Sequence, residues 1–578
     1  MKKSLITLFI GIICLGCGKD FLDVELNGKL TDNVLATEEG IDALLIGAYS
    51  MLDGVSASVE VDTWIGASSN WIFGDLRGLI GYKGSDAGDH FAASGVIHFN
   101  ELPNEPALNT KWKTLYESVA RCNRAIQVIN HAQKTGAITS EQALQYMREA
   151  RGLRGWYHFE AWRFWEKIPF VDENTDYASI NNKTDCRDKI IADLEAGAAL
   201  PDNMGQIGRF NGTVCKVILS KALMQMYHDY EAALPLLEYV KTSGTKPNGG
   251  PIGLADTYSE IFDIEDRNGS EAVYTVQYSV NDGSGGYNGS AGEVLNYPYK
   301  TNGESPAGCC GFFQPGQEYV NSFRTSDGLP LLDFSYNNNP VLNDMGIESS
   351  DNSFIEDPGP LDPRLDWSVG RRGIPYWDWG IHTGKDWIRD QNFGGPYSPK
   401  KQVYKKSQEG IYTENGSWTS GFTANGYRMI RYADVLLLLA ECQIETGDLP
   451  GALGNINAVR ARAANPAGFV KEADGLTPAA NYVISEYPAF PDVDYARRAL
   501  YMERKLELGM EGHRWFDLNR WGITVSELNR VLEYEQTLPT GFMFINIAVG
   551  PEDVTYPLPE REIDLSDGNL LQNRVIEN

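Results

Sequence analysis

Apolar residues recur at helical spacing over three separate parts of the chain. Steps of three and four residues between apolar positions are typical of a helix with one buried face. In the first part these positions are Ile41, Leu44, Leu45, Ala48, Tyr49 and Leu52. The same spacing returns in a middle part (112–129, 143–165, 190–198, 214–227 and 231–241) and in a last part (432–446, 452–464 and 494–512). The pattern predicts a mostly α protein.

Short turns separate several of these helices, which indicates antiparallel pairs. His228-Asp229-Tyr230 joins two helices of the middle part, and Gly447-Asp448-Leu449-Pro450 joins two of the last part. Repeated antiparallel pairs favour tetratricopeptide-like packing, although the sequence has no regular period of about 34 residues.

Two loop-rich regions, 55–104 and 249–423, interrupt the helical pattern. Both are rich in Gly, Ser, Asn and aromatic residues, and 271–280 is the one strand-like run in the second. Connections this long without regular structure are uncommon in compact domains and are often functional. We therefore predict a helical body at 37–54, 105–248 and 424–530, and ligand-binding regions at 55–104 and 249–423.

The first 16 residues have the composition of an export signal. A basic start precedes an apolar run over 5–15, which is too short for a permanent membrane-spanning helix. Gly16-Cys17 follows, and a Cys directly after the cleavage site indicates a bacterial lipoprotein. We predict a signal peptide at 1–16, lipid on Cys17 and a tether at 17–36. Cys14 stands where such signals usually have Leu, so a plain secretory signal is the alternative.

Composition and charge argue against several functions. The chain has 578 residues, 42% hydrophobic and 22% charged, as in ordinary globular proteins. A formal net charge of −28 argues against nucleic-acid binding, which needs a basic surface to neutralise phosphate. No later stretch is apolar for about 18 residues, so we predict no transmembrane helix. After the cleavage site, no Cys or His cluster has zinc spacing.

Several motifs in the C-terminal part form a recognisable set. They are Arg431-Tyr432-Ala433-Asp434 with the apolar run to Glu441, Ile456-Asn457-Ala458-Val459-Arg460-Ala461-Arg462, Glu503-Arg504-Lys505-Leu506-Glu507-Leu508, the segment from Glu511 to Gly522, and the final Pro559-Glu560 and Leu571-Gln572-Asn573. This set resembles the SusD/RagB family, the surface nutrient-binding lipoproteins of Bacteroidetes. The resemblance covers most of the chain and is loose in the two loop-rich regions.

The resemblance implies a fold, a partner and a location. The fold is a single SusD-like domain over 37–578, with an α-helical body of four tetratricopeptide-like helix-turn-helix pairs and large irregular, partly β inserts. The partner is a SusC-type TonB-dependent outer-membrane barrel, which the lipoprotein caps as a lid. Gly18-Lys19-Asp20 is similar to the signal that sends such lipoproteins to the cell surface, where Cys17 anchors the chain in outer-membrane lipid.

The charged residues between 503 and 517 have two interpretations. Carboxylates beside a His and an Arg can act in acid–base catalysis. Spacings of three and four residues also place opposite charges side by side on a helix surface. In the family this motif is structural, and we interpret Glu503, Glu507 and Glu511 as members of such surface pairs.

Aromatic and polar residues of the two loop-rich regions are the candidate ligand-binding residues. A Trp or Tyr ring can cover the apolar face of a sugar, while Asp, Asn and Arg bind its hydroxyls. The candidates are Asp62, Trp64, Asn70, Trp71, Asp75, Arg77 and Asp86 in the first region, and Tyr287, Tyr297, Tyr299, Trp377, Asp378, Trp379, Trp387, Arg389 and Tyr397 in the second. The alternative is that these aromatics form the core of long loops. We predict that at least two of them stack on a ligand.

Cys309-Cys310 adds a further candidate. Outside the cytoplasm, adjacent cysteines can form a vicinal disulfide, which would offer a flat sulfur surface to a ligand. The alternatives are two separate buried thiols or pairing with distant cysteines. We predict the vicinal bridge, because two exposed thiols are reactive.

Three functions fit the sequence. The first is non-catalytic binding of an oligosaccharide or polysaccharide and its delivery to the SusC-type barrel. The second is peptide capture, as in RagB-like members. The third is an extracellular glycoside hydrolase, which needs two carboxylates at a defined separation. We expect no enzyme activity and no required cofactor, although the many Asp residues leave room for a structural calcium ion.

Overall fold

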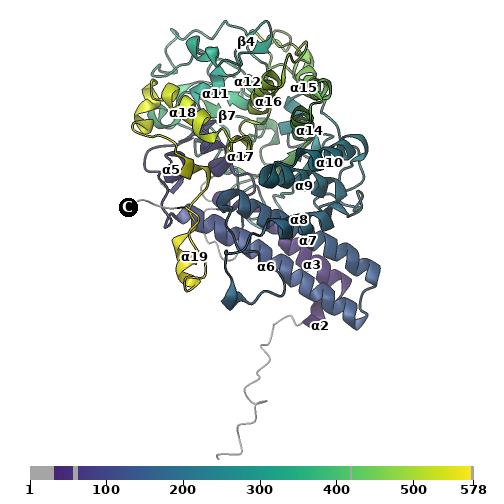
Figure 1. The fold of residues 1–578 in the computed structure, drawn as a ribbon. Helices are drawn as coiled ribbons and strands as arrows, with labels where there is room; N and C mark the ends of the chain where they lie inside the picture. Colours follow the sequence, from purple (N-terminus) through teal and green to yellow (C-terminus); the bar gives the residue numbers. More distant parts are fainter. Residues whose placement is uncertain (1–31, 56–62, 91, 417–418, 575–578) are drawn as a thin grey trace, which may run out of the picture.

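The computed structural model describes residues 32–55, 63–90, 92–416 and 419–574. Among these residues, eight helices pack as four consecutive pairs, and each pair also contacts the next. The pairs are α3 (Glu38–Tyr49) with α6 (Pro106–Thr135), α7 (Ser140–Trp165) with α8 (Arg187–Ala198), α9 (Gly212–Tyr227) with α10 (Tyr230–Ser243), and α14 (Tyr432–Thr446) with α15 (Leu449–Ala463). In Figure 1 the stack runs from α6 and α7 at the base to α14 and α15 at the upper right. The predicted mostly α fold is confirmed.

Local sequence signals set the ends of these helices. The Thr37 hydroxyl accepts the N–H of Gly40 at the start of α3, and Thr139 forms a capping box with Gln142 at the start of α7. At the end of α14, Gly447 adopts the left-handed conformation that favours glycine. The turns predicted from polar and glycine residues are therefore present where the helices stop.

Short strands and helices, joined by long irregular segments, make up the rest of the described chain. The two loop-rich regions meet where β1 (Gly81–Gly84) pairs antiparallel with β3 (Phe312–Pro315). β2 (Ala272–Val276), within the predicted strand-like run, pairs antiparallel with β10 (Tyr427–Arg431), which leads directly into α14. The other elements are α2 (Asp32–Leu35), α4 (Thr63–Gly66), α5 (Ala92–Ile97), α11 (Gln317–Asn321), β4 (Thr325–Ser326), β5 (Leu329–Pro330), α12 (Leu365–Ser368), β6 (Val369–Gly370), α13 (Gln391–Gly394), β7 (Ser398–Pro399), β8 (Thr413–Glu414), β9 (Phe422–Thr423), α16 (Val493–Leu508), α17 (Arg514–Arg520), α18 (Thr524–Glu535) and α19 (Glu560–Leu565).

The first loop-rich region is more regular and more buried than its sequence predicts. A π-helix covers Trp71–Leu76, and residues 69–85 are all buried. Asp75 fixes this segment to the turn before α17, because its carboxylate accepts the N–H groups of Gly512 at 2.8 Å and Arg514 at 3.0 Å. A Cβ at Gly74 would overlap the carbonyl of Gly512, so the close approach requires glycine there.

Buried ion pairs join α16 to the surrounding segments. Glu503 binds Arg460 of α15 at 2.8 Å, and Glu507 binds Arg431 at 2.7 Å. Arg364, immediately before α12, binds both glutamates. These side chains are at most 1% exposed. Figure 1 shows α16 close to α12 and α15 in the upper part of the molecule. The prediction of helix-surface pairs is therefore wrong, because the arginines come from distant segments and the pairs are buried.

The arginines keep this network ionised. Burial by itself would raise the pKa of Glu507, but Arg462, Arg431 and Arg364 hold it well below its usual range. A buried charge without its partners is strongly destabilising, whereas here Glu503 pairs with two arginines and Glu507 with three. The network therefore fixes α15, α16 and the 364 and 431 segments relative to one another.

Within the described part of the chain, no helix combines the length and the apolar character needed to cross a membrane.

Replacing Glu507 with Gln removes the shared partner of three buried arginines. We expect Glu507→Gln to lower the free energy of unfolding by about 3–5 kcal/mol, measured by urea denaturation. Glu195→Gln, on the exposed face of α8, is the matched control and should change stability by about 0.5 kcal/mol or less. Equal stability of the two variants would contradict a structural role for the network.

Glu535 predicts a pH dependence of stability. It is buried at the end of α18, accepting the Tyr82 hydroxyl at 2.5 Å and the Glu318 N–H at 2.9 Å. Burial raises its pKa to about 7. The folded state therefore holds this proton to higher pH than the unfolded chain, and the stability it contributes below about pH 4 is lost as pH rises through 7.

We expect wild-type stability to fall between pH 5 and pH 8 by on the order of 2 kcal/mol more than that of Glu535→Gln. Urea denaturation of both proteins at the two pH values measures the difference. Parallel pH profiles would show that Glu535 is ionised throughout this range in the folded protein.

Candidate ligand-binding surface

Arg389 links the two loop-rich regions at one point on the surface. Its guanidinium pairs with Asp86 at 2.6 Å and with Asp89 at 2.5 Å, and the three side chains are 30–40% exposed. We call Arg389, Asp86 and Asp89 the Arg389 cluster. The β1–β3 pairing positions it, because the N–H of Ser85, after β1, donates to the carbonyl of Gly311, before β3, at 2.6 Å. The Ser85 hydroxyl then accepts from Arg389 at 2.7 Å.

Two partly exposed aromatic side chains flank the Arg389 cluster. The guanidinium carbon of Arg389 lies 5.1 Å from the centre of the Tyr299 ring. Trp64 contacts His90, which follows Asp89, with ring centres 4.9 Å apart, and its indole N–H donates to the imidazole. Trp64 and Tyr299 are both half-buried, so each ring keeps an accessible part. The structure thus brings residues of both regions together.

A vicinal disulfide borders the same surface. Cys309 and Cys310 are joined to each other, and Cys309 is half-buried while Cys310 is buried. The next residue, Gly311, packs so closely that a Cβ there would lie 3.2 Å from the Cβ of Tyr299. The predicted vicinal bridge is confirmed. The free cysteines of the described residues are buried, as predicted, at Cys122, Cys186, Cys215 and Cys442.

Trp377 and Trp379 form a second partly exposed aromatic group. The Trp379 indole donates to the carbonyl of Tyr404 at 2.9 Å, and the Trp377 ring centre lies 4.8 Å from that of Trp367. The 299–311 loop connects this group to the disulfide, because the Ala307 N–H donates to the Tyr404 hydroxyl at 3.0 Å. Both tryptophans are half-buried.

Six of the predicted ligand-binding residues, and Tyr297 with them, are buried, so the prediction that they face a ligand is wrong. Their polar groups bind protein atoms: the Trp71 indole donates to Gly292, Arg77 pairs with Glu101, and the Tyr397 hydroxyl donates to Gln317. A side chain packed in this way has no face open to a ligand. The buried candidates are Asn70, Trp71, Asp75, Arg77, Trp387 and Tyr397.

The remaining candidates have separate positions. Tyr287 is 73% exposed. Asp378 is exposed and accepts the N–H of Ser407 at 2.9 Å. Asp62 and Cys17 lie outside the described residues.

Sequence reasoning missed Asp89 and His90. The signal was present, because both lie in the short acidic, glycine-containing segment that also supplied Asp86. Their role became visible only when Arg389, 300 residues away in sequence from Asp89, was placed beside them.

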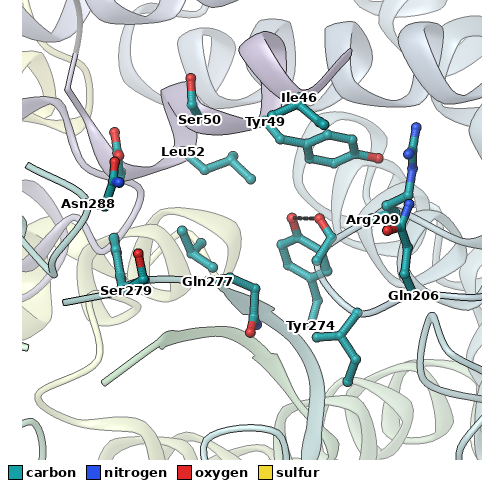
Figure 2. Close-up of a pocket in the computed structure, with 15 residues that line it drawn as sticks. Ile46, Tyr49, Ser50, Leu52, Gln206, Arg209, Tyr274, Gln277, Ser279 and Asn288 are labelled. Carbon is teal, nitrogen blue, oxygen red and sulfur yellow. Dashed lines mark hydrogen bonds between the residues drawn. The ribbon is translucent and has the colours of Figure 1, made fainter. Parts of the chain in front are cut away.

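A separate cleft of about 390 Å³ lies between α3 and β2. Figure 2 shows Tyr49 and Tyr274 in it, with Gln206 and Arg209 at one end and Ser279 and Asn288 at the other. Burial raises the pKa of Asp53, which also lines it, to about 7. The residues that line this cleft include none of the predicted ligand-binding residues.

Within the described residues, no group of three or more His, Cys, Asp or Glu side chains is placed to hold a metal ion.

Comparison with known proteins places this architecture in a family. The sequence profile of the SusD family matches residues 270–575, which is more than half of the chain. The chain belongs to the SusD family. A second profile, described as starch-binding associating with outer membrane, matches residues 20–221.

One relative and two solved structures align with at least 93% of this SusD-family chain. SusD-like protein P25 of Formosa agariphila is 22% identical, over 98% of this chain and 97% of its own. Surface glycan-binding protein A from Bacteroides thetaiotaomicron, solved in complex with laminarihexaose, has a TM-score of 0.64 at 20% identity, covering 93% of this chain and 99% of its own. A structure described as a laminarin-binding SusD-like protein has a TM-score of 0.65 at 19% identity, with the same coverage. These likenesses show a shared fold.

The disulfide predicts a labelling pattern. In the native protein without reductant, a maleimide should label neither Cys309 nor Cys310, because they are joined, and should leave the four buried thiols unlabelled. After unfolding without reductant, those four should label while Cys309 and Cys310 stay protected. Peptide mass spectrometry measures each site. Labelling of Cys309 under these conditions would contradict the bridge.

Proposed function

We propose that this protein binds an oligosaccharide or polysaccharide at the cell surface without cutting it and delivers it to a SusC-type TonB-dependent outer-membrane transporter. Lipid on Cys17 would anchor the chain to the outer membrane. The observation that carries the proposal is the surface on which Trp64, Tyr299 and the vicinal disulfide surround the Arg389 cluster. The glycan-binding descriptions of structurally similar proteins support it.

The chemistry of this surface suits a sugar. Partly exposed Trp and Tyr rings cover the apolar face of a pyranose, and they lose little rotamer entropy because protein contacts already hold them. The carboxylates of Asp86 and Asp89 can accept hydrogen bonds from hydroxyls beyond those they receive from Arg389. Because protein contacts already fix these aromatic and acidic side chains, less conformational entropy is lost when a ligand binds.

The same geometry favours binding over hydrolysis. A glycosidase of the usual kind needs one carboxylic acid that stays protonated to donate to the leaving oxygen. Burial opposes ionisation of Asp86, but together the N–H groups of Asp89 and Gly88 and the Arg389 guanidinium lower its pKa below the ordinary value. Asp86 is therefore unsuited to be a general acid, and Asp89 binds the same guanidinium.

Aromatic substitutions test the proposal. A glycan array followed by titration calorimetry identifies the ligand, and Trp64→Ala and Trp379→Ala should each weaken its binding by about 1–3 kcal/mol, by analogy with aromatic stacking on other flat ligands. Tyr177→Ala is the control, because Tyr177 is 65% exposed and lies on the segment between α7 and α8. It should leave affinity unchanged.

Three results would count against the proposal. Tight peptide binding with no binding to any glycan would favour peptide capture. New reducing ends after incubation with polysaccharide would show hydrolysis. Unchanged glycan affinity in both Trp variants would place the binding site elsewhere.

A further inference from the structure

A largely apolar cavity of about 530 Å³ lies next to the Arg389 cluster. Its apolar lining comes from the end of α5, the segment that follows it, the 393 segment and the 542–544 segment, at Ile97, Leu102, Phe393, Phe542, Met543 and Phe544. Phe393 and Phe542 meet edge to face, with ring centres 5.5 Å apart. Phe542 is 47% exposed and Leu102 is 54% exposed, so the cavity is open to ligands.

Two short segments form a wall shared by the cavity and the Arg389 cluster. The segment after β1 contributes Asp86 and Asp89 to the cluster and Ala87 to the cavity, and β1 itself contributes Lys83 to the cavity. The segment around α13 contributes Arg389 to the cluster and Phe393 to the cavity. A ligand held at the cluster is therefore close enough to place a substituent in the cavity.

The phenylalanine-lined part of the cavity is poorly suited to an unsubstituted sugar ring, while Ser94, Asn100, Asn104 and Glu105 place polar groups elsewhere in its lining. The Tyr82 hydroxyl is committed to Glu535, and the Lys83 ammonium donates to the backbone carbonyls of Asp86 at 2.7 Å and Asp89 at 2.5 Å. Burial and the charge of Lys83 lower the pKa of His98, another lining residue, which disfavours its charged form. Sugar hydroxyls would lose hydrogen bonds to water among the phenylalanine rings, whereas an apolar group would gain by leaving water.

We propose that this cavity binds an apolar aromatic or acyl ester substituent carried by the glycan. The proposal rests on the proposed function, because the adjacent Arg389 cluster holds the sugar that bears the substituent. A planar hydroxycinnamoyl ester matches a cavity whose mouth is formed by two phenylalanines, since offset and edge-to-face aromatic contacts add to the hydrophobic gain. The cavity thereby selects decorated over bare glycans.

Methyl ferulate is the direct probe of the cavity. Saturation-transfer NMR and titration with the full chain should show binding to the wild type that weakens by about fivefold or more in Phe542→Ala, since an aromatic pair and its buried area are lost. Phe542 is half exposed, so this variant should fold. Tyr177→Ala, at an exposed position on the segment between α7 and α8, should leave ferulate binding unchanged. Absence of ferulate binding, or equal binding in Phe542→Ala, would overturn the proposal.

A second measurement separates this proposal from the proposed function. Feruloylated arabinoxylan oligosaccharides and the same material after alkaline removal of the esters are compared on the wild type and Phe542→Ala, beside the glycan array. Stronger binding of the ester form that is lost in Phe542→Ala supports the inference. Glycan binding on the array without ferulate binding overturns this inference alone. Ferulate binding with no binding to any glycan overturns the proposed function and, with it, the assignment of the ester to a glycan.

Discussion

The arrangement of this protein depends on a buried set of ion pairs around α16. Glu503 and Glu507 lie on α16 and Glu511 lies in the turn that follows it, and their partners come from α15, from the end of β10 and from loops far away in sequence. A buried charge that loses its partner is strongly destabilising, so these segments are stable only in the arrangement that keeps the ion pairs together. It connects the helical stack to the second loop-rich region.

Buried polar contacts also fix the first loop-rich region to the helices. Asp75 receives two backbone N–H groups from the turn that follows α16, and its burial raises its pKa to about 6. Tyr82, in β1, donates to Glu535 of α18. Long segments with little regular secondary structure are thus held by buried side-chain hydrogen bonds, and the surface they present at the Arg389 cluster is held with them.

This organisation explains why some aromatic residues of the loop-rich regions are buried in the protein while others remain partly exposed. Trp71, Trp387 and Tyr397 hold the loops in shape from inside, whereas Trp64, Trp377, Trp379 and Tyr299 keep part of their rings at the surface. Both groups lie in segments of similar composition. A large aromatic side chain in a long loop serves packing first, because the loop must bury apolar area to be ordered, and only those at its edge remain available for a ligand.

The sequence by itself determined the helical stack, since apolar spacing, capping residues and turn glycines act within a few residues of one another. It also determined the motifs of the family, and the adjacency of Cys309 and Cys310 was enough to predict their bridge. Only the tertiary structure decided which candidates face a ligand, because burial depends on contacts such as Trp71 with Gly292 and Arg389 with Asp89 that join residues hundreds of positions apart. For the same reason, the sequence indicated surface pairs on α16 where the folded chain has a buried network.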